Sequence, residues 1–171
     1  MPRKNKKLPR HLLVIRTSAM GDVAMLPHAL RALKEAYPEV KVTVATKSLF
    51  HPFFEGLDVG FLDIETRRTH RGIRGAIRFA REAAELKIDA VADMHNVLRS
   101  KMVRAALHLR GIPVSVIHKG RIEKYMRLGR GSEGVKPLKH TVIRYCDVFR
   151  RLGFDFPDPR PAEKRPRPTP M

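Results

Sequence analysis

Cysteine is nearly absent from this sequence of 171 residues, in which Cys146 is the single one. A disulfide framework and a cysteine-ligated metal site are therefore not expected, and a reducing cytoplasm fits the composition best. Tryptophan is absent and tyrosine occurs three times, so the stacking platforms of single-strand nucleic-acid binders are scarce. No apolar run approaches the ~18 residues that cross a bilayer, and we expect no signal peptide after the basic N-terminus.

Several motifs of catalysis and ligand binding are missing as well. The eight histidines show neither a His-Glu-x-x-His pattern nor Cys/His pairs at ligand spacing, so we expect no metal site. The absence of Gly-x-Ser-x-Gly disfavours a hydrolase nucleophile elbow. The turn over residues 17–22 has one glycine, which excludes the three-glycine dinucleotide fingerprint, and no Walker A ending.

Acidic residues are few beside the basic ones, 17 Asp and Glu against 35 Lys and Arg, which gives a net charge of +18. Residues 94–151 hold fourteen Lys and Arg and three acids, and residues 67–81 hold six Arg and no acid. Such a field attracts polyanions: nucleic acid, an anionic membrane face or phosphorylated substrates. The alternative is a solvated surface from an arginine-rich proteome, because net charge concerns association and not fold.

Strands alternate with helices along the chain, which predicts an α/β fold with a Rossmann-like parallel sheet and helices on both faces. Strands are expected at residues 12–15, 40–45, 60–64, 89–93 and 113–117, and helices at 22–36, 48–55, 72–86, 97–108 and 138–152. In the helix over 72–86, the spacing predicts a core-facing stripe of Ile73, Ile77, Ala80 and Ala84. Arg71, Arg74, Arg78 and Arg81 are expected to share another face.

One domain is expected, over residues 11–153. Residues 1–10 are predicted to form a basic disordered arm, and the glycine-containing basic stretch 118–136 a loop. Residues 154–171 contain six prolines and four Lys and Arg, which is typical of a linker or tail.

The segment from His11 to Pro27 is predicted to form a buried strand, a polar turn and a helix. In an open α/β fold this first turn meets ligands, because the helix amides point out of the carboxyl end of the sheet. The hydroxyls of Thr17 and Ser18 and the amides around Gly21 could therefore hold a sugar or an anion. Asp22 is either a functional carboxylate or a structural one, a helix N-cap or a first-turn acid favoured by the helix dipole, and its position alone favours the structural role.

A second polar group follows the strand over 89–93. Asp93, His95 and Asn96 lead into a helix that carries Arg99 and Lys101. This edge of the sheet is again the ligand-facing one. Buried or capping roles for Asp93 and Asn96 beside a solvated basic face are equally consistent with the pattern.

Three blocks of sequence, in order between residues 11 and 153, carry a resemblance to a known family. They are residues 16–23 with 30–38 behind them, residues 89–100, and residues 139–153. Together they resemble the N-terminal domain of the ADP-heptose:lipopolysaccharide heptosyltransferase family, which belongs to glycosyltransferase family 9. The pair His95-Asn96 departs from the Gln-Gly type of pair that is more usual there.

The resemblance implies the N-terminal half of a GT-B fold, in which two Rossmann-like domains face each other across a cleft. It implies inverting transfer of heptose from ADP-heptose to an anionic lipid A–Kdo-type acceptor in lipopolysaccharide core biosynthesis, with Asp22 as the general base. The implied enzyme is cytoplasmic and peripheral to the inner membrane. The residues then expected to bind the acceptor are Thr17, Ser18, Gly21, Asn96, Arg99, Lys101, Arg121, Lys139, His140 and Arg144.

The donor site would belong to a second domain that this chain lacks. The chain alone is therefore expected to bind acceptor, to bind no cofactor, and to be inactive in transfer. A non-catalytic basic module that binds nucleic acid or anionic lipid is the alternative, and it predicts steep salt dependence without preference for lipopolysaccharide core. A family 9 transferase for another sugar is the other alternative.

Overall fold

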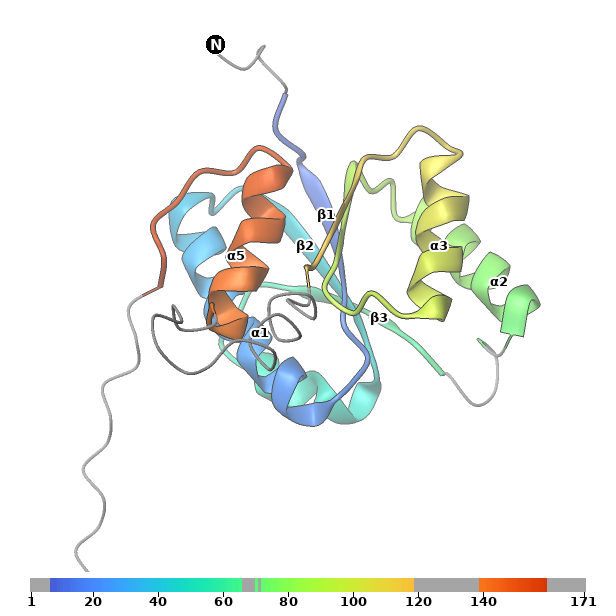
Figure 1. Ribbon diagram of the computed structural model, residues 1–171, viewed down its shortest axis with the longest axis horizontal. Helices are drawn as coiled ribbons and strands as arrows, with labels where there is room; N and C mark the ends of the chain where they lie inside the picture. The colour runs from blue at the N-terminus through green and yellow to red at the C-terminus, as the bar shows by residue number, and fades with distance from the viewer. Residues whose placement is uncertain (1–6, 66–69, 71, 119–138, 160–171) are drawn as a thin grey trace, which may run out of the picture.

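Residues 7–65, 70, 72–118 and 139–159 are described by a computed structural model. They form a five-stranded parallel sheet in the order β3-β2-β1-β4-β5, with helices on both faces (Figure 1). The elements are β1 (His11–Ile15), α1 (Met20–Ala36), β2 (Lys41–Thr46), the 3-10 helix η1 (Ser48–Phe54), β3 (Gly60–Asp63), α2 (Gly72–Glu85), β4 (Ala90–Asp93), α3 (Leu98–His108), β5 (Val114–Val116) and α5 (Thr141–Arg151). The predicted Rossmann-like α/β fold is confirmed.

The central strand β1 explains why the sheet forms from this sequence. Its five residues are all buried, which matches the unbroken apolar run expected of a parallel strand covered on both faces. In register, Leu13 lies between Thr43 of β2 and Val91 of β4. Side chains alternate along the strand, so Leu12 faces one layer of the core and Leu13 the other.

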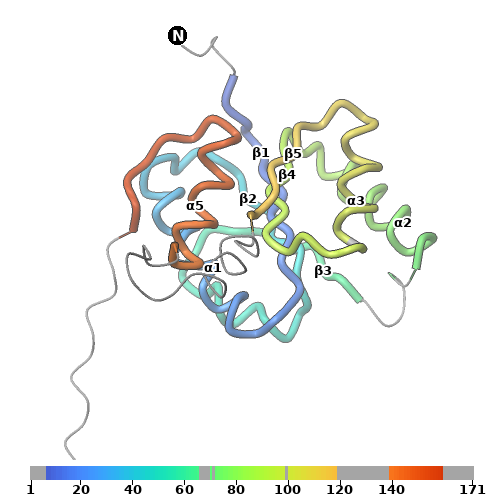
Figure 2. The backbone as a smooth tube through the Cα atoms, in the orientation of Figure 1, coloured from blue at the N-terminus to red at the C-terminus, as the bar shows by residue number. Residues whose placement is uncertain are grey.

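Two helical layers cover the sheet, and Figures 1 and 2 show them on opposite sides of β1 and β4. On one face, α1 and α5 pack together with η1, and Leu30 of α1 and Phe149 of α5 belong to the same core cluster. On the other face, α2 and α3 pack together, with Phe79 and Leu107 in a second cluster. All these α-helices follow strands of one parallel sheet, so their N-termini gather at its carboxyl edge.

The predicted core stripe of α2 is wrong for its isoleucines. Ile73 and Ile77 are 70% and 46% exposed. The side that is buried consists of Gly75, Ala76, Phe79, Ala80 and Ala83. The reason is a close approach at Gly75, where a Cβ would lie 2.2 Å from the carbonyl carbon of His70. Only glycine fits there, so Gly75 and the large ring of Phe79 face the sheet and the isoleucines turn outward.

The other expectations for α2 have mixed outcomes. Ala80 is buried as predicted, and Ala84 is half-buried. Arg74, Arg78 and Arg81 are exposed, as the shared face predicts. Arg71 lies outside the described residues.

The core extends beyond Gly153. Phe154 and Phe156 are buried, and the ring of Phe154 meets that of Tyr37 edge to face at 5.2 Å between centroids. The backbone N–H of Asp155 donates to the Tyr37 hydroxyl at 2.9 Å. The expectation that a linker begins at Phe154 is therefore wrong for residues 154–156. The high proline content of the tail suggested a linker, but Phe154 and Phe156 pack into the core.

Other expectations fall on residues that the structure does not describe. Residues 1–6 of the predicted arm, residues 119–136 of the predicted loop and the tail over 160–171 lie outside the described residues. The expectation of a disordered arm over 1–10 is wrong at Pro9, which is buried, and at Arg10, whose backbone N–H donates to Oδ2 of Asp89 at 2.9 Å. Helix α5 begins at Thr141, whereas the predicted helix began at 138. Among the described residues, no helix combines the length and apolar character needed to cross a membrane.

Candidate functional site

The site predicted from the sequence lies where the strand order reverses. Strands β1 and β4 are neighbours in the sheet, yet their connections leave in opposite directions, to β2 and to β5. Such a switch point opens a crevice at the carboxyl ends of the two strands, which is where open α/β sheets bind ligands. Here the loop after β1 carries Arg16, Thr17 and Ser18, and the loop after β4 carries His95 and Asn96.

Asp22 lies in the first turn of α1 and forms an ion pair with Arg16. The carboxylate side chain is 44% exposed, whereas the guanidinium is buried. The N-cap position belongs to Ala19, without a side-chain cap hydrogen bond, so Asp22 is not the N-cap but an acid in the first turn of α1, the other structural role that its position predicts. Arg16 donates through Nη2 to Oδ2 of Asp22 and through Nη1 to the carbonyl of Met94. The arginine thus ties an accessible carboxylate to the end of β4.

Arg16 is the residue of this site that the sequence reasoning did not single out. It is buried directly after the apolar strand β1, and its Nε has no hydrogen-bond partner among the described residues. The centre of its guanidinium lies 5.9 Å from the ring centroid of Tyr145. A buried arginine has to be paired, so an arginine at the end of a buried strand, six residues before an aspartate, was the available signal.

Tyr145 of α5 fixes the start of α1 from the other side. Its hydroxyl donates to the backbone carbonyl of Asp22 at 2.9 Å. Burial raises the pKa of Tyr145 to about 12, an effect that Arg16 opposes and Asp22 reinforces. The phenol therefore stays protonated at neutral pH and acts as a fixed donor. This contact brings the N-terminal end of α5 to the same edge as Asp22.

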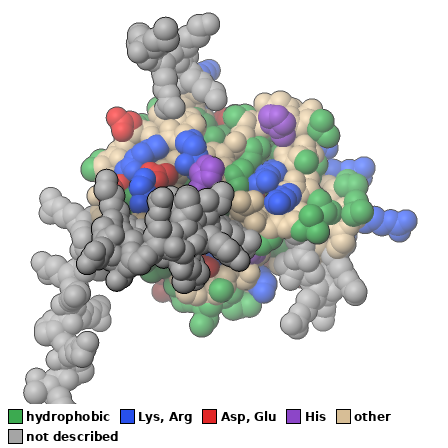
Figure 3. Space-filling model, in the orientation of Figure 1, with side chains coloured by type: hydrophobic (Ala, Val, Ile, Leu, Met, Phe, Trp, Pro, Cys, Tyr) green, Lys and Arg blue, Asp and Glu red, His purple; other side chains and the backbone are tan. Residues whose placement is uncertain are grey.

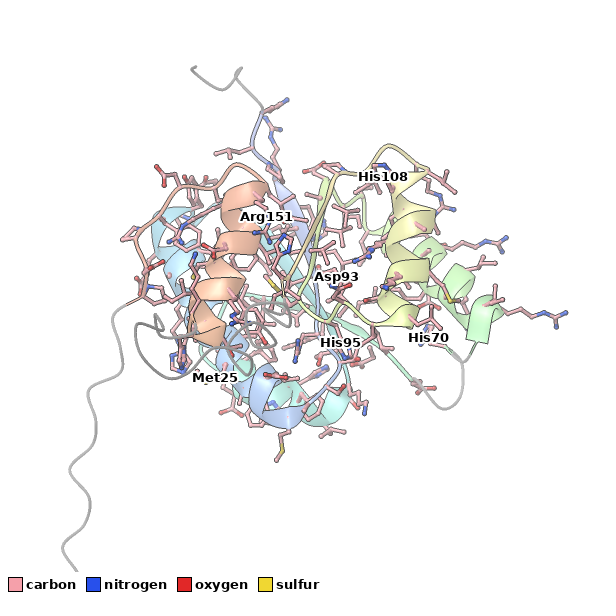
Figure 4. All side chains as sticks on the ribbon, in the orientation of Figure 1. Met25, His70, Asp93, His95, His108 and Arg151 are labelled. Carbon is pink, nitrogen blue, oxygen red and sulfur yellow. The ribbon has the colours of Figure 1, made fainter. Side chains whose placement is uncertain are left out.

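Thr17 and Ser18 share one partner, His95. The Thr17 hydroxyl lies 2.8 Å from Nδ1 and the Ser18 hydroxyl 3.1 Å from Nε2 of the imidazole. One ring nitrogen of a neutral histidine donates a hydrogen bond and the other accepts one, and a hydroxyl group can accept from the first or donate to the second. The two loops of the switch point are thereby joined side chain to side chain. Figure 4 shows His95 at the end of the sheet, with Asp93 above it in β4.

Asp93 organises the loop after β4 from inside the protein. It is fully buried, and its Oδ1 accepts the backbone N–H groups of His95 at 2.9 Å and Asn96 at 2.8 Å. Its Oδ2 pairs with Arg104 of α3 at 3.1 Å. Asn96 has a φ of 48°, a left-handed conformation that asparagine tolerates better than most residues. Asp93 therefore has the buried, structural role that the sequence analysis gave as one of its two alternatives.

A cavity of about 360 Å³ opens beside these loops, on the side of the sheet covered by α2 and α3. Thr17, Ser18 and His95 line it, and His70 and Lys47 add polar groups. Its remaining walls are mainly apolar: Ile15, Ile64, Ala76, Phe79, Val97, Leu98 and Val103. Figure 4 shows His70 toward α2 and His95 toward the sheet. An apolar pocket with few converging polar groups is the usual form of a small-ligand site.

The remaining predicted acceptor residues are distributed around this edge. Gly21 is exposed in the first turn of α1, with open space where a side chain would stand. Asn96 uses its amide within the protein, on the carbonyl of Ile117 and on Arg104. Lys101 is exposed on α3. The side chain of Arg99 and the whole of Arg121 lie outside what the structure describes.

Three predicted residues cluster at the N-terminal end of α5. Lys139 pairs with Asp147 at 2.8 Å, and the imidazole of His140 accepts the N–H of Val142 at 3.4 Å. Arg144 donates through Nε to the carbonyl of Lys139 at 2.9 Å. The next residue is Tyr145, so this basic cluster lies near the α1 start and on the face away from the cavity.

Among the described residues, no group of three or more His, Cys, Asp and Glu side chains is placed to hold a metal ion.

Comparisons with known proteins place the fold among solved structures. No family model and no curated protein sequence matches the chain. The glycosyl transferase family 9 structure from Veillonella parvula DSM 2008 matches with a TM-score of 0.64 at 17% identity, over 90% of this chain and 44% of that one. E. coli heptosyltransferase WaaC with ADP-2-deoxy-2-fluoro heptose matches at 0.59 and 22%, over 88% and 50%. E. coli ADP-heptose lps heptosyltransferase II matches at 0.55 and 20%, over 92% and 44%.

The chain therefore spans about half the length of the solved structures that it matches. At these identities the likeness establishes the fold. The resemblance to family 9 heptosyltransferases seen in the sequence is confirmed at that level: this chain has the fold of part of a GT-B glycosyltransferase.

Proposed function

We propose that this chain is the acceptor-binding half of a glycosyltransferase of the heptosyltransferase type, with Asp22 as the general base. The observation that carries the proposal is the position of Asp22. An accessible carboxylate is held by a buried arginine at the switch point of a fold shared with solved heptosyltransferases.

The chemistry proposed for Asp22 is proton removal. The acceptor hydroxyl attacks the anomeric carbon of the donor sugar, the bond from that carbon to the nucleotide breaks, and the hydroxyl proton passes to the carboxylate of Asp22. Arg16 orients one oxygen of Asp22 through Oδ2. Attack opposite the leaving nucleotide inverts the anomeric centre. ADP-heptose is the proposed donor, and it would be held by a separate donor-binding domain.

The acceptor is proposed to lie across the cavity mouth and the basic start of α5. The cavity offers the hydroxyls of Thr17 and Ser18 to a sugar ring, because each hydroxyl has more hydrogen-bonding sites than its contact with His95 uses. The +18 charge of the chain supports an anionic acceptor of the lipid A–Kdo type, because Lys and Arg bind phosphate and carboxylate groups strongly. Such an acceptor places the enzyme at the cytoplasmic face of the inner membrane.

The experiment that tests this proposal measures heptose transfer from ADP-heptose to a Kdo-lipid A acceptor in the full-length parent enzyme that the proposal requires. We expect Asp22→Asn to lower kcat by about 10²–10⁴-fold, the usual contribution of a general base, with the acceptor KM little changed. Glu35→Gln is the matched control, an exposed acid near the other end of the same helix α1. Transfer by the Asp22→Asn enzyme at the wild-type rate would refute the assignment.

A basic polyanion-binding module is the competing function that the net charge favours. The two are separated by titrating the chain with lipopolysaccharide core fragments and with duplex DNA at several salt concentrations. A specific acceptor site predicts tighter binding of the core fragment and a shallow salt slope. Equal affinity for both ligands, with a steep common slope, would favour the polyanion module.

A further inference from the structure

The outward side of α2 carries a pattern that the proposed active site does not use. Ile73 and Ile77 stand one helical turn apart and are 70% and 46% exposed. Arg74, Arg78 and Arg81 are exposed on the same helix. We call these five residues the α2 outer face. A single exposed isoleucine needs no explanation, but two at helical spacing among arginines form an amphipathic surface of the kind that lies on membranes.

Charge is unevenly spread along α2. The first turn contains no acid. The two acids of the helix, Glu82 and Glu85, stand at its C-terminal end, where Glu82 takes hydrogen bonds from His70 and from Arg78 at 3.0 Å each. Arg78 is still 63% exposed beside that partner. The positive and apolar groups are thus concentrated toward the N-terminal half of the helix, where the helix dipole adds positive charge.

The N-terminal end of α2 lies at the edge of the sheet that carries Asp22. Helices α2 and α3 pack against each other, and both begin at this carboxyl edge. The first residue of α3, Leu98, is 76% exposed and lines the rim of the 360 Å³ cavity. Figure 3 shows hydrophobic and basic side chains next to one another at the right-hand side, over α2 and α3. The amphipathic surface therefore adjoins the opening of the candidate site.

We propose that the α2 outer face docks this protein on the surface of an anionic lipid bilayer, with the isoleucines entering the headgroup region and the arginines meeting lipid phosphates. Charge complementarity supports this occupant, because basic side chains near an anionic leaflet each favour binding. Nucleic acid would use the arginines and leave the isoleucines without a role. A second copy of the chain would need a larger apolar area, since stable interfaces bury ~800 Å² per partner.

The α2 outer face is a separate set of residues from those proposed for sugar transfer, so the two proposals can fail independently. Vesicles that contain no glycosyl acceptor test the docking alone.

The experiment is sedimentation of the 171-residue chain with vesicles of phosphatidylcholine, with and without phosphatidylglycerol. We expect binding to the anionic vesicles, reduced at least about tenfold by the double substitution Ile73→Ser with Ile77→Ser. Replacing Arg74, Arg78 and Arg81 by Gln is expected to reduce the binding by on the order of fivefold per arginine. The matched controls, Leu109→Ser and Arg31→Gln, should bind as the wild type does. Leu109 is 88% exposed just after α3 at the opposite edge, and Arg31 is exposed on α1.

Each other outcome overturns the proposal. Binding that survives the serine substitutions but disappears with salt would mean polyanion attraction by the basic chain as a whole. A wild-type dimer that Ile73→Ser with Ile77→Ser converts to a monomer would make the α2 outer face a contact between copies. Absence of binding to anionic vesicles would also refute docking. Circular dichroism melting curves verify that each variant is folded before it is compared.

Discussion

Removal of the Asp93 side chain should destabilise the loop after β4, and with it the domain. The carboxylate is fully buried and has three partners: the N–H groups of His95 and Asn96 on Oδ1, and Arg104 on Oδ2. Hydrogen bonds to a charged group contribute ~1.5–3 kcal/mol each, and breaking a buried ion pair costs ~3–5 kcal/mol. These costs overlap, and Arg104 is partly exposed. We therefore expect Asp93→Ala to cost about 4 kcal/mol of the free energy of unfolding.

Asp93→Asn separates the two halves of this network. An asparagine oxygen at the position of Oδ1 can still accept both backbone N–H groups, whereas its amide nitrogen would face Arg104 as a second donor. We expect a cost of about 2 kcal/mol, the loss of one charged partner. In an Arg104→Met background, the same Asp93→Asn substitution should cost much less, because the partner is already absent.

The assay is urea unfolding followed by circular dichroism, with all variants compared at one pH. The reasoning would be refuted if the free energy of unfolding of Asp93→Ala were within ~1 kcal/mol of the wild-type value, because losing a buried carboxylate with three partners should cost more than that. Equal costs for Ala and Asn would mean that the two backbone hydrogen bonds contribute nothing.

Three further predictions concern groups whose pKa is shifted by burial. Burial raises the pKa of the Cys146 thiol to about 11, so a disulfide reagent at mildly alkaline pH should label it only as the protein unfolds in urea; rapid labelling of the folded protein would contradict this. Burial lowers the pKa of His11, so the unfolded state binds more protons and stability should fall as pH drops through about 6.5; His11→Gln should flatten that decline in urea midpoints. Tyr145→Phe removes the hydroxyl bond to Asp22 and should cost about 1 kcal/mol in the same assay.

The fold could be predicted from the sequence because its local signals agree with one another. The apolar run of β1 and the leucine spacing of α1 point to the same alternating architecture that the structure shows. The orientation of α2 could not be predicted, because it depends on the close approach of Gly75 to the backbone of His70, which hydrophobic periodicity does not report. Periodicity assigns the most hydrophobic residues to the buried side of a helix, so it predicted that Ile73 is buried. The buried side of α2 instead contains Gly75 and Phe79.

The candidate site was predictable in position and less so in its contacts. The carboxyl ends of β1 and β4 follow from the topology, so the placement of Thr17, Ser18 and Asp22 at this edge could be predicted, and their roles stay predictions. The hydrogen bond from Arg16 to the carbonyl of Met94 joins segments distant in sequence, and no local pattern reports it, whereas the six-residue spacing from Arg16 to Asp22 was an available signal. Nor does a local pattern report the partners of His95, whose ring contacts Thr17 and Ser18, which lie 78 and 77 residues earlier in the sequence.

The most direct test of the central claim is a nuclear magnetic resonance titration of the 171-residue chain with a soluble Kdo-lipid A-type acceptor fragment. We expect shifts in the backbone amides over residues 17–22 and 95–96, at the switch point. The amides over residues 108–111, at the opposite end of α3, should not move. Shifts confined to that far end, or no shifts with saturating fragment, would contradict an acceptor site at the carboxyl edge of β1 and β4.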